Sequence, residues 1–137
     1  MGAKAVFIPM QEPADSQIGN GQALGHGADP AVAKGLLARC EMVVGMRLHS
    51  LIFAVGAGVP CVPIAYDPKV SSFARDAGLG ESIVIGDDQA AIAGIMRSAW
   101  DNRQASADKL AANFINLKKQ ALCCGALAAQ VLENTEH

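Results

Sequence analysis

The stretch that most constrains how this chain can fold is residues 43–69, VVGMRLHSLIFAVGAGVPCVPIAYDPK. Its two apolar runs are too short and too continuously apolar for amphipathic helices, whereas the segment between them repeats apolar residues at i, i+3, i+4 and i+7 from Leu48. Glycines and then Pro60 end that helix. This alternation predicts a βαβ unit with parallel strands at residues 41–45 and 61–65.

Polar side chains follow both strands of this unit. Arg47 and His49 lie in the turn after the first strand, and Tyr66, Asp67 and Lys69 lie in the turn after the second. Parallel strands joined through a helix place both C-terminal turns on one edge of the sheet, about 5 Å apart at the strand level. We therefore expect Arg47, His49 and Lys69 to face one crevice.

This combination of residue types favours an anion site with acid–base chemistry. Backbone N–H groups and the helix dipole at a helix N-terminus add to the positive charge of nearby side chains such as Arg47 and Lys69. An imidazole held there, as we expect for His49, can transfer protons near neutral pH.

The rest of the chain predicts strands and helices in alternation. Residues 5–8 form a short β-rich run that Pro9 stops, so we expect a first strand whose following turn, residues 9–15, reaches the same edge. Asp29 and Pro30 are typical of a helix start. The remaining expected elements are a short helix at 15–19, a short strand at 22–24, helices at 30–40, 70–78, 87–102 and 105–133, and a strand at 81–85.

This order indicates an α/β fold, an open, doubly wound parallel sheet covered by helices on both faces. A chain of 137 residues suits one such domain. In the last helix, which would break near Gly125 if anywhere, one apolar stripe is expected to join the core and to have no functional role. The stripe consists of Leu110, Phe114, Leu117, Ala121 and Leu122.

Several classes of function are disfavoured by composition and by absent motifs. The net charge of −2 gives no basic surface for nucleic acid. The P-loop pattern does not occur, and Gly19 and Gly21 have the wrong spacing to Gly25 for a dinucleotide fingerprint, so no cofactor is expected. No apolar run is long enough for a transmembrane segment.

The four cysteines predict neither a metal site nor a disulfide framework. Cys40, Cys61, Cys123 and Cys124 form no CxxC pair and have no metal-ligand spacing with the histidines. We expect buried thiols in a reducing, cytoplasmic compartment.

The central stretch resembles the polysaccharide pyruvyl transferase family. The resemblance rests on GMRLH, the apolar helix after it, the Val-Pro strand and the YDPKV turn, and it extends more weakly upstream through VFIPMQEPAD and DPAVAKGLLARCEMVVG. It implies an enzyme that transfers the pyruvyl group of phosphoenolpyruvate to a sugar as a ketal in cell-wall or capsular polysaccharide. It also implies one Rossmann-like half of a GT-B-like two-domain architecture.

The resemblance assigns roles residue by residue. His49 would be the catalytic proton-transfer residue and Lys69 a phosphoenolpyruvate contact, while Arg47 would be either an anion contact or the holder of its turn. Tyr66 and Asp67 would orient the turn or the acceptor sugar, although Asp67 before a proline is also typical of a plain turn. The acceptor would be a saccharide, lipid-linked in some members, which would place the protein at the inner face of the membrane.

Family members are about twice this length, so residues 1–137 are expected to form only the C-terminal domain. Without the N-terminal domain we expect the chain to be inactive and to expose an apolar surface suited to a homodimer. Two alternatives stay open: half of a GT-B glycosyltransferase or nucleotide-sugar epimerase, and a self-associating α/β module without enzymatic activity.

Overall fold

Three parallel strands form the central sheet of the computed structural model, which describes residues 2–11, 13–15, 18, 23–25, 27 and 29–135. They are β1 (Val43–Gly45), β2 (Cys61–Ala65) and β3 (Ile83–Val84), and they lie in the order β1-β2-β3. In this register Gly45 pairs with Pro63 and Ile64 pairs with Ile83. The α/β class and the parallel sheet are confirmed; the described strand order contains no reversal.

Helices alternate with these strands, and aspartates begin three of them. The helices are α1 (Pro30–Leu37), α2 (Leu48–Gly56), α3 (Pro68–Asp76), α4 (Gln89–Asp101) and α5 (Arg103–Thr135). The side chains of Asp29, Asp67 and Asp88 accept hydrogen bonds from backbone N–H groups in the first turns of α1, α3 and α4. These are the N-cap bonds that helix starts require.

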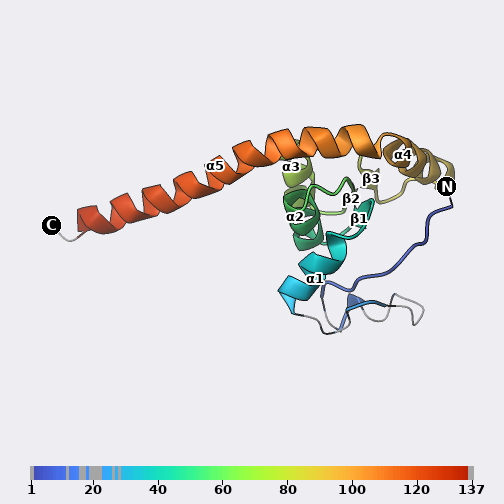
Figure 1. Ribbon diagram of the computed structural model, residues 1–137, viewed down its shortest axis with the longest axis horizontal. Helices are drawn as coiled ribbons and strands as arrows, with labels where there is room; N and C mark the ends of the chain where they lie inside the picture. Colours follow the sequence, from blue (N-terminus) through green and yellow to red (C-terminus); the bar gives the residue numbers. More distant parts are fainter. Residues whose placement is uncertain are drawn as a thin grey trace.

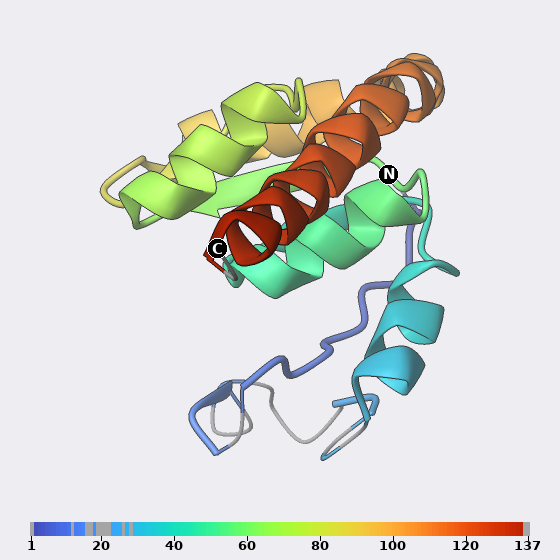
Figure 2. The same cartoon turned by 90° about the vertical axis from the view of Figure 1, so that its left-hand side faces the viewer.

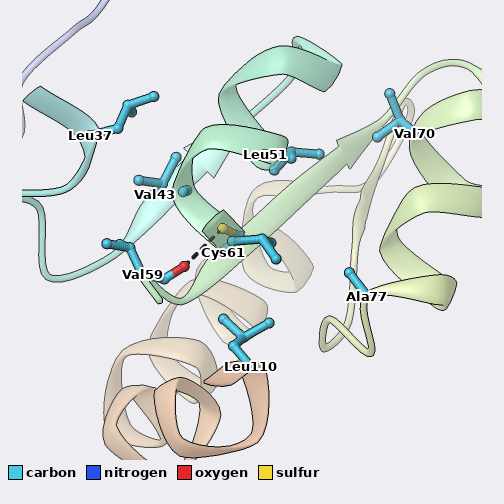
Figure 3. Packing of buried hydrophobic residues seen from close by; sticks show 10 residues of the cluster. Leu37, Val43, Leu51, Val59, Cys61, Val70, Ala77 and Leu110 are labelled. Carbon is cyan, nitrogen blue, oxygen red and sulfur yellow. Dashed lines mark hydrogen bonds between the residues drawn. The ribbon is translucent and has the colours of Figure 1, made fainter. Parts of the chain in front are cut away.

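Helices cover both faces of the sheet because successive strand residues point to opposite sides. Cys61 of β2 joins the core beneath α2 and α3, which Leu110 of α5 completes (Figure 3). Val62 points the other way and packs with Ile83 and with Ile95 of α4. In Figure 2, α2, α3 and α5 lie in front of the sheet and α4 lies behind it.

The N-terminal segment departs from the expected first strand. Of residues 5–8, only Phe7 pairs as a strand does, in an isolated parallel bridge with Ala23, and the segment runs outside the three-stranded sheet (Figure 1). Val6 is exposed whereas Ile8 is half-buried against the core, so neither side of the run is buried along its length, and Pro9 supplies no backbone donor to continue a ladder. The helix expected at 15–19 falls largely outside the described residues.

The last helix is longer and less buried than the stripe predicts. It runs unbroken through Gly125, and Leu110 and Leu117 pack on the core as expected. Leu122, however, is 66% exposed, because α5 leaves the domain after its first half (Figure 1). The prediction that the whole stripe joins the core was therefore wrong for its second half.

Only part of the prediction about the cysteines is confirmed. Cys61 is buried, its thiol donates a hydrogen bond to the Val59 carbonyl at 3.1 Å, and burial raises its pKa to about 12 (Figure 3). Cys40 is half-buried, whereas Cys123 and Cys124 are exposed on α5. All four are free thiols.

Among the described residues, no helix combines the length and the apolar character that crossing a bilayer requires.

Close packing of α2 against the end of β1 depends on Gly45. A Cβ atom there would lie 2.6 Å from the Ser50 hydroxyl oxygen and 2.7 Å from Leu51 Cδ2, both in buried side chains. We expect Gly45→Ala to lower the free energy of unfolding by about 1–3 kcal/mol through overpacking. Urea denaturation measures this loss. Gly94→Ala is the control, because Gly94 lies in α4 with open space around it and should gain about 0.5–1 kcal/mol.

Candidate functional site

The candidate site lies where α2 and α3 begin, at the carboxyl ends of β1 and β2. Arg47 is the N-cap residue of α2 and Asp67 is the N-cap residue of α3, each two residues past its strand. Because β1 and β2 are neighbouring parallel strands, both helix starts lie on the same edge of the sheet. The sequence prediction placed the site at this edge.

Arg47 is held by Asp15, a residue that our sequence analysis did not single out. The Arg47 guanidinium donates to Asp15 Oδ1 through Nη2 at 2.7 Å and through Nε at 3.2 Å. The second oxygen of Asp15 accepts the backbone N–H groups of Met10 at 3.1 Å and Gln11 at 2.9 Å. One buried carboxylate thus ties the turn at residues 10–15 to the start of α2.

These contacts shift the titration of both partners. The hydrogen bond from Arg47 lowers the pKa of Asp15, and the Met10 and Gln11 amides add to this, while burial acts in the opposite direction. The bond to Asp15 is also the main cause that raises the pKa of Arg47, with a smaller contribution from Tyr66. Tyr66 therefore lies beside Arg47, although the two come from different turns.

The main chain of Arg47 is anchored as well. Its carbonyl accepts the Ser50 hydroxyl at 2.6 Å and the Ser50 N–H at 3.0 Å, and Ser50 is buried. With the Asp15 contact on one side and Ser50 on the other, the turn that leads into α2 is held in one geometry. Within the described residues, the Arg47 side chain does not cap α2.

His49 lies exposed in the first turn of α2, accessible to a ligand at this edge. Its ring is tilted by 54° to that of Phe53, one turn along the helix, with 6.4 Å between ring centroids. The imidazole is therefore not enclosed in the hydrophobic interior.

Lys69 is also exposed, in the first turn of α3. Its backbone N–H donates to Asp67 Oδ1 at 2.8 Å, and its ammonium lies 3.7 Å from Asp67 Oδ2. The Lys69 side chain is 57% exposed, so this ion pair is solvated and weak. Asp67 thus starts the helix and sits beside the amine, which remains available to an incoming anion.

The structure brings some of the predicted residues into contact and leaves others on the same edge. Arg47 lies against Tyr66, and Lys69 against Asp67, while His49 occupies the adjoining helix start. The pattern that could have pointed to Asp15 is the acidic turn in VFIPMQEPAD, which precedes the site by about 30 residues. A long-range ion pair of this kind leaves no periodic signal in the sequence.

Two hollows on the described surface lie away from this edge. One, of about 200 Å³, lies at the start of β2, and its lining includes Pro60, Cys61, Glu81 and Lys109. The other lies between the end of α3 and α5. Neither includes Arg47, His49 or Lys69. The candidate site is an open edge of the sheet, because His49 and Lys69 are both exposed there.

Comparison with known proteins gives one match. The family model for polysaccharide pyruvyl transferase matches residues 2–68, a segment that includes Asp15, Arg47, His49 and Asp67 and ends one residue before Lys69. No curated protein and no solved structure matches the chain.

The pairing of Asp15 with Arg47 predicts how the site responds to pH. Because the pKa of Asp15 is lowered in the folded state, its contribution is present above the unfolded-state value of 3.8 and is lost as pH falls through the lower folded value. We expect Asp15→Asn to release the turn at residues 10–15, so that limited proteolysis there is faster at pH 7. The unmodified chain should show the same release only in strong acid.

The matched control for this experiment is Asp76→Asn, which removes an exposed carboxylate 3.7 Å from Arg75. An exposed pair of this kind contributes less than about 1 kcal/mol, so proteolysis of the turn should not change. Equal cleavage rates for Asp15→Asn and the unmodified chain at pH 7 would show that the ion pair does not hold the turn.

Proposed function

We propose that the edge formed by α2 and α3 binds phosphoenolpyruvate and helps to transfer its pyruvyl group to a sugar as a ketal, because residues 2–68 match the family model for polysaccharide pyruvyl transferase. The observation that carries this proposal is the position of His49 and Lys69. Both are exposed, and they lie in the first turns of two helices that follow neighbouring strands. An acid–base group and a cation are thus presented at one edge.

The chemistry of phosphoenolpyruvate fits this arrangement. The donor has a phosphate and a carboxylate, and the ammonium of Lys69 together with the backbone N–H groups at the start of α2 supplies positive potential. The N-terminus of α2 is suited to this role because, within the described chain, its N-cap side chain is directed to Asp15. Positive charge near the phosphate would also stabilise its departure.

We assign His49 the proton transfer. In the reaction, one sugar hydroxyl adds to C2 of the donor while a proton is delivered to its methylene carbon, which becomes the methyl group. A second hydroxyl then forms the other C2–O bond and phosphate leaves with the bonding electron pair. Each hydroxyl loses a proton, of which one balances the methyl group and the other leaves with phosphate or solvent. An exposed imidazole at this edge can move these protons.

The contacts favour a positioning role for Arg47. Its guanidinium is already paired with Asp15 and adjoins Tyr66, so we assign it to holding the turn that presents His49. Tyr66 and Asp67 would in the same way orient the second turn, since Asp67 caps α3 beside Lys69. Contacts of Tyr66 and Asp67 with the acceptor sugar belong to this proposal too.

The openness of the edge bears on turnover. His49 and Lys69 are exposed to solvent, whereas a reaction through an enol donor benefits from a site that excludes water and orients both substrates. We propose that another surface, such as a second α/β domain, completes the cleft and carries acceptor contacts, and that this chain alone binds the donor without turning it over. The acceptor is a saccharide, in keeping with the family, and a lipid-linked one would bring the site to a membrane.

Titration calorimetry with phosphoenolpyruvate tests the assignment. We expect Lys69→Gln to weaken binding by about tenfold or more, equivalent to about 1.4 kcal/mol, because it removes the exposed cation. His49→Gln should leave binding within about threefold, since we assign His49 to proton transfer rather than to holding the anion. Lys34→Gln is the control, because Lys34 is exposed on α1 away from this edge.

Three outcomes would contradict the proposal. Binding of a nucleotide-diphosphate sugar in preference to phosphoenolpyruvate would favour the glycosyltransferase or epimerase alternative. An equal loss of affinity in Lys34→Gln and Lys69→Gln would show that only net charge matters. Release of phosphate from phosphoenolpyruvate by the chain alone would contradict the need for a second surface.

A further inference from the structure

The second half of α5 is a helix that the domain does not cover. In the first half, Leu110 is buried in the core, Phe114 lies 3.7 Å from the position of a Cβ on Gly56, and Asn113 donates to the Ala77 carbonyl at 3.2 Å. Every described side chain from 118 to 133 is exposed, and the helix extends away from the domain (Figure 1).

This exposed half is almost entirely apolar. Residues 120–132, QALCCGALAAQVL, contain no charged side chain. Leu122, Leu127 and Leu132 are between 61% and 69% exposed. Exposure of so many apolar side chains to water is unfavourable. Exposed apolar surfaces of this kind mark sites where a protein associates with a partner.

The helical state of this segment also requires stabilisation from outside. A helix of fewer than about 15 residues that packs on nothing is marginal in water, and most helical stability in proteins comes from tertiary packing. Within residues 120–132 there are no charged i, i+4 pairs, and Gly125 lies near the middle, where glycine costs about 1 kcal/mol relative to alanine. A helix that is continuous through this segment therefore needs a surface to cover it.

One exposed face of this half repeats apolar residues at the helical spacing. It consists of Leu122, Ala126 and Ala129, which follow one another at four and three residues. Lys119 and Glu133 continue the same face at its two ends, three residues before Leu122 and four residues after Ala129. Apolar positions that alternate at three and four residues are the pattern by which helices pack side by side.

The charges at the two ends of the exposed half identify the partner. Lys118 and Lys119 lie where α5 leaves the domain, and Glu133 lies near the other end. Antiparallel pairing of two identical segments brings the lysines of each copy beside Glu133 of the other, whereas parallel pairing brings like charges together. The last turn of α5 has no basic residue of its own, so the partner's lysines would also complement its negative dipole end.

We propose that residues 118–133 of α5 form an antiparallel two-helix interface with the same residues of a second copy of this chain. A two-fold axis near Ala126 relates the copies, so that both use the same surface. The segment is about 24 Å long at about 1.5 Å per residue, and the alanines near its centre allow the helices to approach closely. The interface is independent of the proposed transfer chemistry.

Light scattering after size exclusion, over protein concentrations from about 1 µM to 1 mM, tests the dimer. We expect a mass that rises to that of two chains, and Ala126→Lys should raise the dissociation constant at least about tenfold by placing two like charges near the axis. Ala112→Lys makes the same substitution at an exposed position on the first half of α5 and should leave the constant unchanged. A monomer at every concentration, or a dimer indifferent to Ala126→Lys, would overturn the proposal.

Charge reversal tests the orientation. The double variant Lys118→Glu, Lys119→Glu should weaken an antiparallel dimer, because three acidic side chains then meet at each end, and adding Glu133→Lys should restore it. A parallel dimer would show no such rescue, because like charges face each other in every one of these variants. Circular dichroism on each variant shows whether helicity follows association, as expected for a segment that its partner stabilises.

Discussion

The parallel pairing of β1 with β2 is the constraint on which the rest of the structure depends. β1 ends at Gly45, opposite Pro63, and β2 ends two residues further on, at Ala65, so the N-cap residues of α2 and α3 follow their strands at the same edge of the sheet. The same pairing sends Cys61 and Val62 to opposite faces, which gives α2 and α3 one core and α4 another. A shift of register by one residue would exchange these faces and bury the wrong side chains.

The ion pair between Asp15 and Arg47 extends this order to a segment that the sheet does not hold. The described residues between 7 and 15 contribute one isolated bridge, yet the Asp15 carboxylate accepts hydrogen bonds from the Arg47 guanidinium and from two backbone N–H groups. The N-terminal segment is thus attached at the edge where His49 and Lys69 are exposed. A part of the chain with little regular structure thereby shapes the turn next to the candidate site.

The sequence predicted the central βαβ unit well, because the spacing of its apolar residues and the residues that begin and end its helices indicate the same elements. The apolar spacing from Leu48, the Gly–Pro break before β2 and the aspartates that cap α1, α3 and α4 are local signals, and each element appears within a few residues of its expected bounds. The strand expected at 5–8 does not join the sheet. Strand pairing depends on a partner that is distant in the sequence, and the local residue pattern does not identify that partner. The roles of the site residues are assignments that rest on side-chain chemistry and exposure. They concern Arg47, His49, Tyr66, Asp67 and Lys69.

The contrast between the buried and exposed cysteines has a practical consequence. Burial and a high pKa keep the Cys61 thiol protonated and shielded, and burial likewise raises the pKa of Cys40, whereas Cys123 and Cys124 face solvent in the middle of the uncovered half of α5. Thiolates and not thiols react with alkylating reagents. The rate at which Cys123 and Cys124 are alkylated in the native protein therefore reports whether a partner covers that part of α5. The measurement needs no added fluorophore and no engineered cysteine.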